Sequence, residues 1–181
     1  MIFNIGNFGL FRRNRIEPDR PVIKPEMGPI DWLIETFALA GLGFFLGFVI
    51  YHFPKLPEII PTHFDGSGHA DEFGNKNTFL VLPGITVFIY VLLTLINQVP
   101  HIFHYPGKIT PSNALRQYTL ATRMIRILKT ILIWTFFYVC NRTILVINNP
   151  ASGLGIWFIP VFIACLFIPI IIYFILALKK A

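Results

Sequence analysis

The sequence PKLPEIIPTHFDGSGHADEFGNK, residues 54–76, is the longest polar interruption between two strongly apolar segments of this 181-residue chain. An Asp-Gly pair and a Ser-Gly pair follow one another at residues 65–68. Such pairs mark tight turns, because glycine accepts positive φ while the polar side chain caps the nearby backbone. Three prolines hold the beginning of the segment extended, since each restricts its own backbone and that of the preceding residue. We therefore expect a structured loop over residues 54–78.

The composition indicates the class of protein. Hydrophobic residues make up 55% of the chain and charged residues only 13%, against roughly 25% charged residues in soluble domains. An integral membrane protein is therefore expected, with residues 29–181 forming a single domain. The net charge of +6 suggests a nucleic-acid partner. Because the basic residues gather beside apolar runs, we expect the bilayer to be the partner instead.

Four apolar segments are long enough to cross a bilayer, which takes about 20 helical residues. The expected spans are residues 30–53, 79–98, 127–147 and 154–178. They predict an all-α fold, an integral membrane four-helix bundle. Thr110 as N-cap and Pro111 at the first helical position mark a helix start, so residues 111–126 are expected to extend the third span as a cytoplasmic helix with a basic face.

The first span contains the pattern Gly43-x-x-x-Gly47. Glycines four residues apart on a membrane helix let another helix approach closely. The pattern predicts such a contact on this face of the span. It does not choose between a helix of the same chain and a helix of a second copy, so the oligomeric state stays open.

The basic residues predict the orientation. Of 15 Lys and Arg residues, only Lys55, Lys76 and Arg142 fall on the side of the loop, and the other twelve fall on the side of the termini. The positive-inside rule then places both termini in the cytoplasm and the loop outside. Residues 1–28 are a cytoplasmic segment. Either its apolar residues rest in the headgroup region beside its arginines, or it is a flexible tail.

Three motifs resemble a known bacterial family. They are residues 56–64 (LPEIIPTHF), residues 68–76 (GHADEFGNK) and residues 105–118, which contain YPGKIT, Asn113 and the pair Gln117-Tyr118. In order and spacing they resemble the domain-of-unknown-function 1648 family (DUF1648), over about residues 45–130. This membrane domain also forms the N-terminal part of SDP-type immunity proteins, which have further spans. The resemblance implies the bacterial cytoplasmic (inner) membrane and, loosely, an immunity role.

The loop concentrates polar side chains within a short distance, and we expect it to be the binding surface. A metal site is one hypothesis, because imidazole and carboxylate ligands suit zinc and similar ions. The alternative is a turn-rich loop in which Asp and Ser side chains cap backbone amides. No helix fixes the ligand geometry, as it would in H-E-x-x-H, and no cofactor is expected. The candidate binding residues are Pro61, His63, Asp65, His69, Asp71, Glu72 and Lys76, and the candidate metal ligands among them are His63, His69 and Asp71.

Charged residues inside spans need partners, since an intramembrane charge costs at least about 2.5 kcal/mol near the bilayer centre. Arg142 lies near the outer end of the third span, where we expect it to meet an acid of the loop. Glu35, near the start of the first span, has Arg126 and Lys129 at similar depth and is expected to pair with them. The acids considered for Arg142 are Asp65, Asp71 and Glu72.

Together these features favour a non-enzymatic recognition, immunity, sensor or accessory protein that acts through its loop. Its expected partners are the lipid bilayer and a secreted peptide or a membrane protein. One alternative is a small oligomeric transporter or channel, which a continuous polar seam from Glu35 to Arg142 would favour. The other is a metal-dependent membrane enzyme, which convergence of His63, His69 and a carboxylate would favour.

Overall fold

The computed structural model describes residues 20–179, so the prediction for residues 1–28 lies mostly outside the described residues. Four helices are long and apolar enough to cross a membrane. The predicted multi-pass all-α membrane fold is therefore confirmed, with a small hairpin in the loop between the first two helices. The elements are α1 (Pro29–His52), β1 (Ile59–Phe64), β2 (Ala70–Asn75), α2 (Val81–Ile96), α3 (Ala114–Asn148) and α4 (Phe158–Leu178), with 3₁₀ helices at Phe53–Lys55, Lys76–Leu80, Pro100–Ile102 and Pro150–Ser152.

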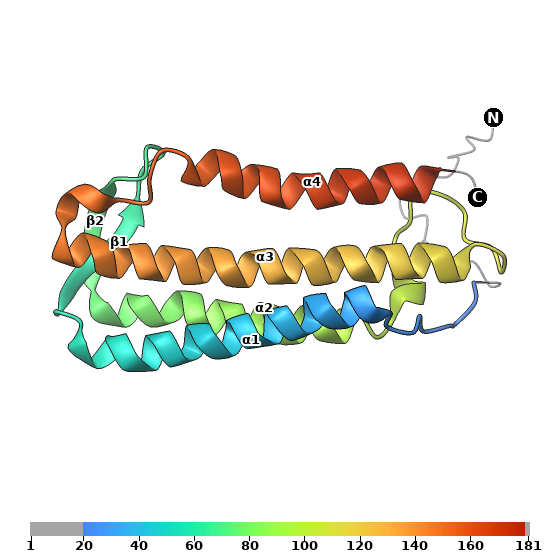
Figure 1. Ribbon diagram of the computed structural model, residues 1–181, viewed down its shortest axis with the longest axis horizontal. Helices are drawn as coiled ribbons and strands as arrows, with labels where there is room; N and C mark the ends of the chain where they lie inside the picture. The colour runs from blue at the N-terminus through green and yellow to red at the C-terminus, as the bar shows by residue number, and fades with distance from the viewer. Residues whose placement is uncertain (1–19, 180–181) are drawn as a thin grey trace, which may run out of the picture.

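The long helix α3 is the centre of the bundle. It packs against α1 and α2 on one side and against α4 on the other (Figure 1). The two strands and the turn between α3 and α4 lie together at one end of the molecule, which we call the hairpin end. The connector between α2 and α3 lies at the other end, which we call the connector end.

The hairpin is seated on the helices by an apolar cluster. Leu56 and Ile60, from the segment that leads into the hairpin and from β1, are buried against residues of α1 and α3. Phe79, in the 3₁₀ helix that follows β2, is buried in the same cluster. Contacts of this kind hold a loop because an ordered apolar side chain loses its packing if the loop lifts away. The remaining buried members are Phe45, Val49 and Cys140.

The first described residues are bound to the connector end. Arg20 donates a hydrogen bond of 2.8 Å from Nη1 to the carbonyl oxygen of Phe103. The hydroxyl of Tyr118, a fully buried residue of α3, donates to the carbonyl oxygen of Pro21 at 3.0 Å. The chain before α1 therefore packs on the connector and on the start of α3.

Helix α3 begins later than predicted. Residues 111–113 form a turn, and the helix starts at Ala114 after the N-cap residue Asn113. The Asn113 side chain accepts a hydrogen bond from the amide of Thr110 at 2.9 Å, so it closes the turn instead of Thr110 capping the helix. From Ala114 the helix continues without a break through both the predicted extension and the predicted third span.

The close helix approach occurs at a different glycine from the one predicted. A Cβ placed on Gly41 would lie 2.9 Å from ring atoms of Trp134 on α3. A Cβ on Gly43 or Gly47 would have no atom within 4 Å. The prediction of a contact at the G-x-x-x-G pattern is therefore wrong within the chain, because the bulky indole of Trp134 occupies the space beside Gly41 instead.

Candidate functional site

The tip of the hairpin is organised by one carboxylate. Oδ1 of Asp65 accepts hydrogen bonds from the amide of Ser67 at 2.8 Å, from its hydroxyl at 2.6 Å and from the amide of His69 at 2.9 Å. These donors, with the Ser67 hydroxyl first, lower the pKa of Asp65, because they stabilise the charged carboxylate. Asp65 therefore caps the turn, which is the alternative to a metal ligand.

The two loop histidines bind different partners. Nδ1 of His63 lies 2.6 Å from Oδ1 of Asp71 across the hairpin, and both side chains are exposed to solvent. Nδ1 of His69 lies 2.8 Å from the hydroxyl of Ser67. The hydrogen bond to Asp71 raises the pKa of His63, because the carboxylate stabilises the imidazolium.

The predicted metal ligands therefore do not form a site. Between residues 20 and 179 no group of three His, Cys, Asp or Glu side chains is placed to hold a metal ion. His63 and Asp71 satisfy each other, while His69 turns toward the hairpin tip. The convergence that would favour a metal-dependent enzyme is not found among these three residues.

The remaining candidate residues hold the hairpin or face outward. Lys76 donates from Nζ to Oε1 of Glu58 at 2.7 Å, which closes the base of the hairpin. Pro61 is buried, and the strand pairing is irregular on its C-terminal side. A proline cannot donate to the ladder, so such irregularity is expected there. Glu72 is exposed and lies opposite His63 in the register.

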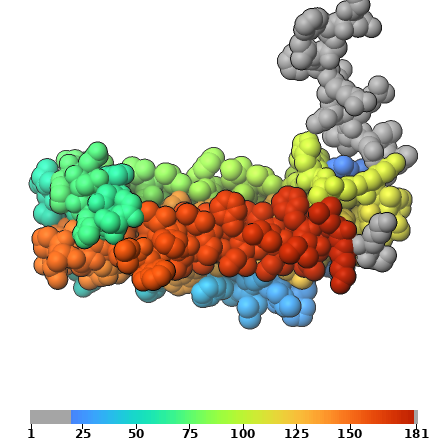
Figure 2. Space-filling model, turned by 90° about the horizontal axis from the view of Figure 1, so that it is seen from above, coloured from blue at the N-terminus to red at the C-terminus, as the bar shows by residue number. Residues whose placement is uncertain are grey.

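The tip of the hairpin is joined to the turn between α3 and α4. The carbonyl oxygen of Gly68 accepts a hydrogen bond of 2.6 Å from the amide of Leu154. Gly68 has a φ of +85°, and a Cβ there would lie 2.9 Å from the amide nitrogen of Gly155. Figure 2 shows this part of the chain against the residues that precede α4. We call the combined surface of residues 59–75 and 150–157 the hairpin platform.

Arg142, on α3, stabilises the turn between α3 and α4. Its Nε donates to the carbonyl oxygen of Gly153 at 2.6 Å, and its Nη2 donates to the carbonyl oxygen of Ser152. The prediction that Arg142 meets an acid of the loop is therefore wrong. The chain folds back over Arg142 after α3 and presents free carbonyl groups, which need donors at a helix end. The acids considered for it have other roles or face outward.

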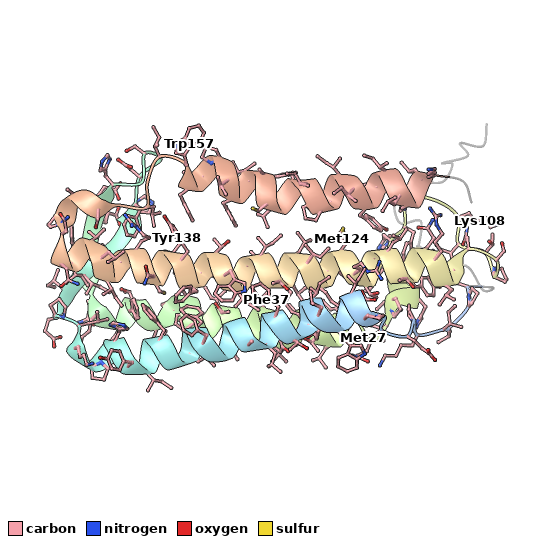
Figure 3. All side chains as sticks on the ribbon, viewed as in Figure 1. Met27, Phe37, Lys108, Met124, Tyr138 and Trp157 are labelled. Carbon is pink, nitrogen blue, oxygen red and sulfur yellow. The ribbon has the colours of Figure 1, made fainter. Side chains whose placement is uncertain are left out.

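The hairpin platform exposes large apolar side chains beside its charged ones. Ile59 and Phe73 are each 61% exposed, and Ile156 and Trp157 are 72% and 74% exposed. Trp157 is the N-cap residue of α4 and lies at the start of that helix (Figure 3). Exposed aromatic groups on a well-ordered surface are typical of contact sites, and tryptophan is also typical of membrane interfaces.

A second group of candidate residues lies near the connector end, inside the bundle. Asp31 of α1 accepts two hydrogen bonds from the guanidinium of Arg123 on α3, at 2.8 and 3.0 Å. Oε1 of Glu35 lies 2.5 Å from Nζ of Lys129. Arg126 stands between the two pairs, 3.6 Å from Asp31 and 3.8 Å from Glu35. We call these five residues the charge cluster.

The second helix takes part in the cluster through neutral groups. The hydroxyl of Tyr90 donates to Oε1 of Glu35 at 3.2 Å, and Nζ of Lys129 donates to the hydroxyl of Thr94 at 2.8 Å. The side chain of Lys129 has no exposed surface. A buried charge without its partner is strongly unfavourable, so the cluster fixes the mutual register of α1, α2 and α3.

The sequence indicated only part of this cluster. Glu35 was expected to meet Arg126 and Lys129, and the structure brings the three together. The partner of Asp31 and the contributions of Tyr90 and Thr94 were missed. The spacing contains a signal for the Asp31 pair. Asp31 and Glu35 are four residues apart, so they lie on one face of the first helix. Arg123, Arg126 and Lys129 are three residues apart, so they lie on one face of the third helix.

Apolar layers separate the charge cluster from Arg142. Ala38, Leu42 and Ile133 are buried together next to the cluster along α1 and α3. Phe45 and Cys140 belong to the next buried cluster toward the hairpin end. Buried apolar side chains of α1 and α3 thus lie between Glu35 and Arg142.

Comparison with known proteins gives a family match over part of the chain but no activity. Residues 39–87 match the family described as Domain of unknown function (DUF1648). The matched segment covers most of α1, the hairpin and the start of α2. The resemblance to this family is confirmed over that segment, which starts earlier and ends earlier than expected.

One curated relative is an uncharacterized protein of the archaeon Archaeoglobus fulgidus, 33% identical over 63 residues. The matched segment covers 30% of this chain and 34% of the relative, so the chain spans about a third of the relative's length. No solved structure matches the chain.

Proposed function

We propose that this multi-pass membrane protein is a recognition component that binds a polypeptide at the hairpin platform. The partner is a secreted peptide or the exposed segment of another membrane protein. The observation that carries the proposal is the hydrogen bond between Gly68 and Leu154, which makes the hairpin and the α3–α4 turn a single surface. A surface ordered before binding loses less conformational entropy when a partner docks.

The composition of the surface supports a polypeptide partner. Phe73 and Trp157 are exposed aromatic groups, the type that most often provides binding energy at protein interfaces. The charged residues around them include Asp71 and Glu72, which are both exposed. Such a mixture suits a partner with apolar side chains and a basic or neutral rim.

The proposal includes an orientation. Both termini lie in the cytoplasm of a bacterial cell, and the hairpin platform faces outward from the cytoplasmic membrane. The support is the distribution of basic residues, of which twelve fall on the side of the termini and three on the side of the hairpin.

The orientation is tested with a single cysteine. Cys140 and Cys165 are replaced by alanine, and Ser67, which is exposed at the hairpin tip, is replaced by cysteine. A membrane-impermeant maleimide added to intact cells should label this variant. Labelling only after the cells are opened would overturn the orientation.

The recognition role is tested by site-specific crosslinking in cells of the source organism. A photoreactive amino acid at Phe73 is expected to give a discrete polypeptide adduct. The control is the same amino acid at Leu95, which is also exposed but lies near the connector end of α2. The Phe73 adduct should disappear in a Trp157→Ser background if the two residues belong to one binding surface. Adducts to lipid alone, or the same adducts at both positions, would overturn the proposal.

The structure favours recognition over the alternative of a transporter. A channel or transporter needs polar groups along its path, whereas the buried residues of α1 and α3 between the charge cluster and Arg142 include Ala38, Leu42, Phe45, Ile133 and Cys140.

A further inference from the structure

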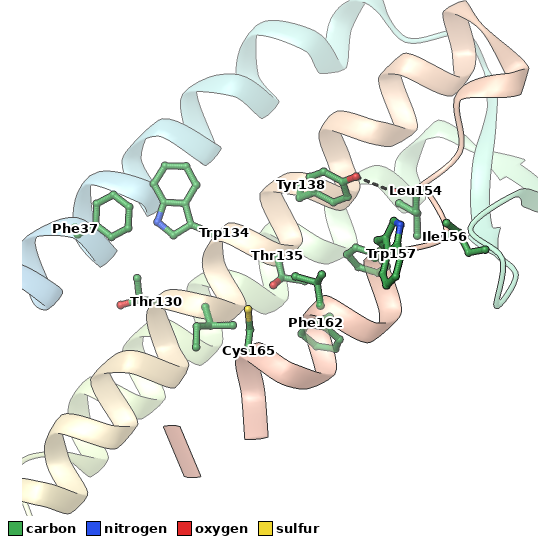
Figure 4. A pocket seen from close by; sticks show the side chains of 14 residues that line it. Phe37, Thr130, Trp134, Thr135, Tyr138, Leu154, Ile156, Trp157, Phe162 and Cys165 are labelled. Atoms are coloured by element: carbon green, nitrogen blue, oxygen red, sulfur yellow. Dashed lines mark hydrogen bonds between the residues drawn. The ribbon is translucent and has the colours of Figure 1, made fainter. Parts of the chain in front are cut away.

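An open groove lies between α4 and the rest of the bundle. It adjoins the proposed recognition surface, because Leu154, Gly155, Ile156 and Trp157 line one end of it. Its volume is about 750 Å³, and it extends from α4 across α3 to Phe37 of α1. Figure 4 shows its walls, with Thr135 of α3 near Phe162 and Cys165 of α4, and Trp134 of α3 beside Phe37 of α1. We call it the α4 groove.

The groove exists because α4 is held to α3 mainly near its two ends. Near the connector end, Gln117 of α3 donates to the carbonyl oxygen of Ala177 at 2.8 Å, and Tyr173 packs with Ala121. Near the hairpin end, the rings of Tyr138 and Phe158 stack with their centroids 5.5 Å apart. Between these contacts the two helices leave room for another group.

The lining is mostly apolar, and two of its hydroxyl groups are already hydrogen-bonded. None of the lining residues is charged. The hydroxyl of Thr130 donates to the carbonyl oxygen of Arg126 at 2.8 Å, and the hydroxyl of Tyr138 donates to the carbonyl oxygen of Leu154 at 2.8 Å. Nε1 of Trp134 has no hydrogen-bond partner among the described residues, but it lies beside Gly41 of α1. A polar ligand would therefore replace few of its hydrogen bonds to water here, which is costly. The groove therefore suits a hydrocarbon ligand.

We propose that the α4 groove binds one acyl chain of a membrane phospholipid, in the half of the bilayer nearer the hairpin platform. The walls belong to α1, α3 and α4, three helices with the length and apolar character of membrane spans. At that depth hydrocarbon is the surrounding solvent, so an acyl chain reaches the groove by moving sideways.

The size of the groove favours an acyl chain over a partner helix. Along α3 the lining runs from Thr130 to Tyr138, which is a length of about 12 Å at 1.5 Å per residue. A helix with side chains is about 10–12 Å wide and would fill roughly 900–1,400 Å³ over that length. The groove offers about 750 Å³. A single extended hydrocarbon chain is thinner and can enter without moving α4.

The end of the groove nearer the hairpin platform indicates where the lipid headgroup lies. Trp157, Gly155 and Leu154 line that end, and Trp157 is 74% exposed. Tryptophan prefers the level of the headgroups. The bound lipid therefore has its headgroup beside the turn between α3 and α4. Its acyl chain extends from there toward the connector end, between α3 and α4.

The first test counts retained lipid by native mass spectrometry after extensive washing in detergent. The wild-type protein is expected to keep one phospholipid. Cys165→Phe, which fills the groove, should lose it, while Ala164→Phe, the neighbouring exposed position of α4 outside the lining, should keep it. Thr135→Leu fills the groove from α3 and should also reduce retention, which guards against a folding defect of the first variant. Equal retention in all four proteins would overturn the proposal.

The second test uses phospholipid with brominated acyl chains, which quench tryptophan on contact. The chain has three tryptophans, and a Trp32→Phe variant leaves Trp134 and Trp157, both in the groove lining. Quenching should saturate at one lipid per protein and should disappear in the variant that also carries Cys165→Phe. Quenching without saturation, or a dimer that Cys165→Phe converts to a monomer, would show that no single acyl chain occupies the groove.

Discussion

The carbonyl oxygen of Gly68, at the tip of the hairpin, accepts a hydrogen bond of 2.6 Å from the amide of Leu154, in the turn between α3 and α4. The two residues are far apart in the sequence, and their contact links the loop after the first helix to the beginning of the last. Arg142 supports the same turn through its carbonyl groups. The hairpin end of the protein therefore behaves as one structural unit.

Gly68→Ala is expected to destabilise this unit, by about 1–3 kcal/mol. The φ of +85° is unfavourable for alanine by roughly 1–2 kcal/mol, and the new methyl group would meet the backbone of Gly155. Chemical unfolding in detergent measures the loss, and hydrogen exchange of the β2 amides locates it.

The matched control for this prediction is Gly66→Ala. A Cβ at Gly66 has no atom within 4 Å, so its unfolding curve should stay close to that of the wild type. An equal loss of stability in both variants would contradict the role assigned to the contact with the α3–α4 turn.

The charge cluster predicts an asymmetry between two substitutions. Glu35→Gln leaves Lys129 charged and fully buried, and should cost about 3 kcal/mol of unfolding free energy. Lys129→Met should cost less, roughly 1–2 kcal/mol, because Glu35 keeps Tyr90 and Arg126 as neighbours. Stability in detergent is the measurement for both.

The double variant Glu35→Gln/Lys129→Met tests whether the two residues act together. It should be more stable than Glu35→Gln alone, because removing the lysine also removes its unpaired charge. Strictly additive losses would mean that the two side chains do not interact energetically.

Gly41→Ala should weaken the contact between α1 and α3. The methyl group would lie 2.9 Å from the indole of Trp134, which is itself stacked on Phe37 at 5.1 Å between ring centroids. Overpacking of this kind costs about 1–3 kcal/mol. Gly43→Ala is the control, since it meets no atom within 4 Å, and a melting temperature lowered equally by both would refute the assignment.

The pair His63–Asp71 makes the hairpin sensitive to pH. The carboxylate raises the pKa of His63 above its ordinary value of 6.5 in the folded protein. The stabilisation is therefore complete below about pH 6.5 and is lost as the pH rises through the raised pKa. Hydrogen exchange in β1 and β2 should become faster over that interval. His63→Gln should abolish the change, and His69→Gln should keep it.

Several features could be predicted because they depend on local sequence. Continuous apolar runs marked the four membrane helices, and Asp-Gly and Ser-Gly pairs marked the turn at the hairpin tip. Glu35 was matched with Arg126 and Lys129 from depth alone. Each of these predictions uses positions along a helix or within a turn, which can be counted from the sequence.

The errors concern the choice among several possible partners for a residue. Asn113 closes a turn that resembles a helix start at Thr110, so the helix begins later. Arg142 was paired with acids by charge, but the carbonyl groups of residues 152 and 153 lie closer to it. Gly41 meets Trp134, although the G-x-x-x-G pattern lies two residues further on.

By itself the sequence determined that four helices cross a membrane and that a stiff polar loop separates the first two, because hydropathy, proline and turn chemistry act on neighbouring residues. Only the tertiary structure decided that the loop is a hairpin joined to the α3–α4 turn and that Asp31 pairs with Arg123. It also decided that α4 lies far enough from α3 to leave a groove. Those features depend on which side chains meet across the bundle, and packing geometry, not residue type, selects among the partners that charge and size allow.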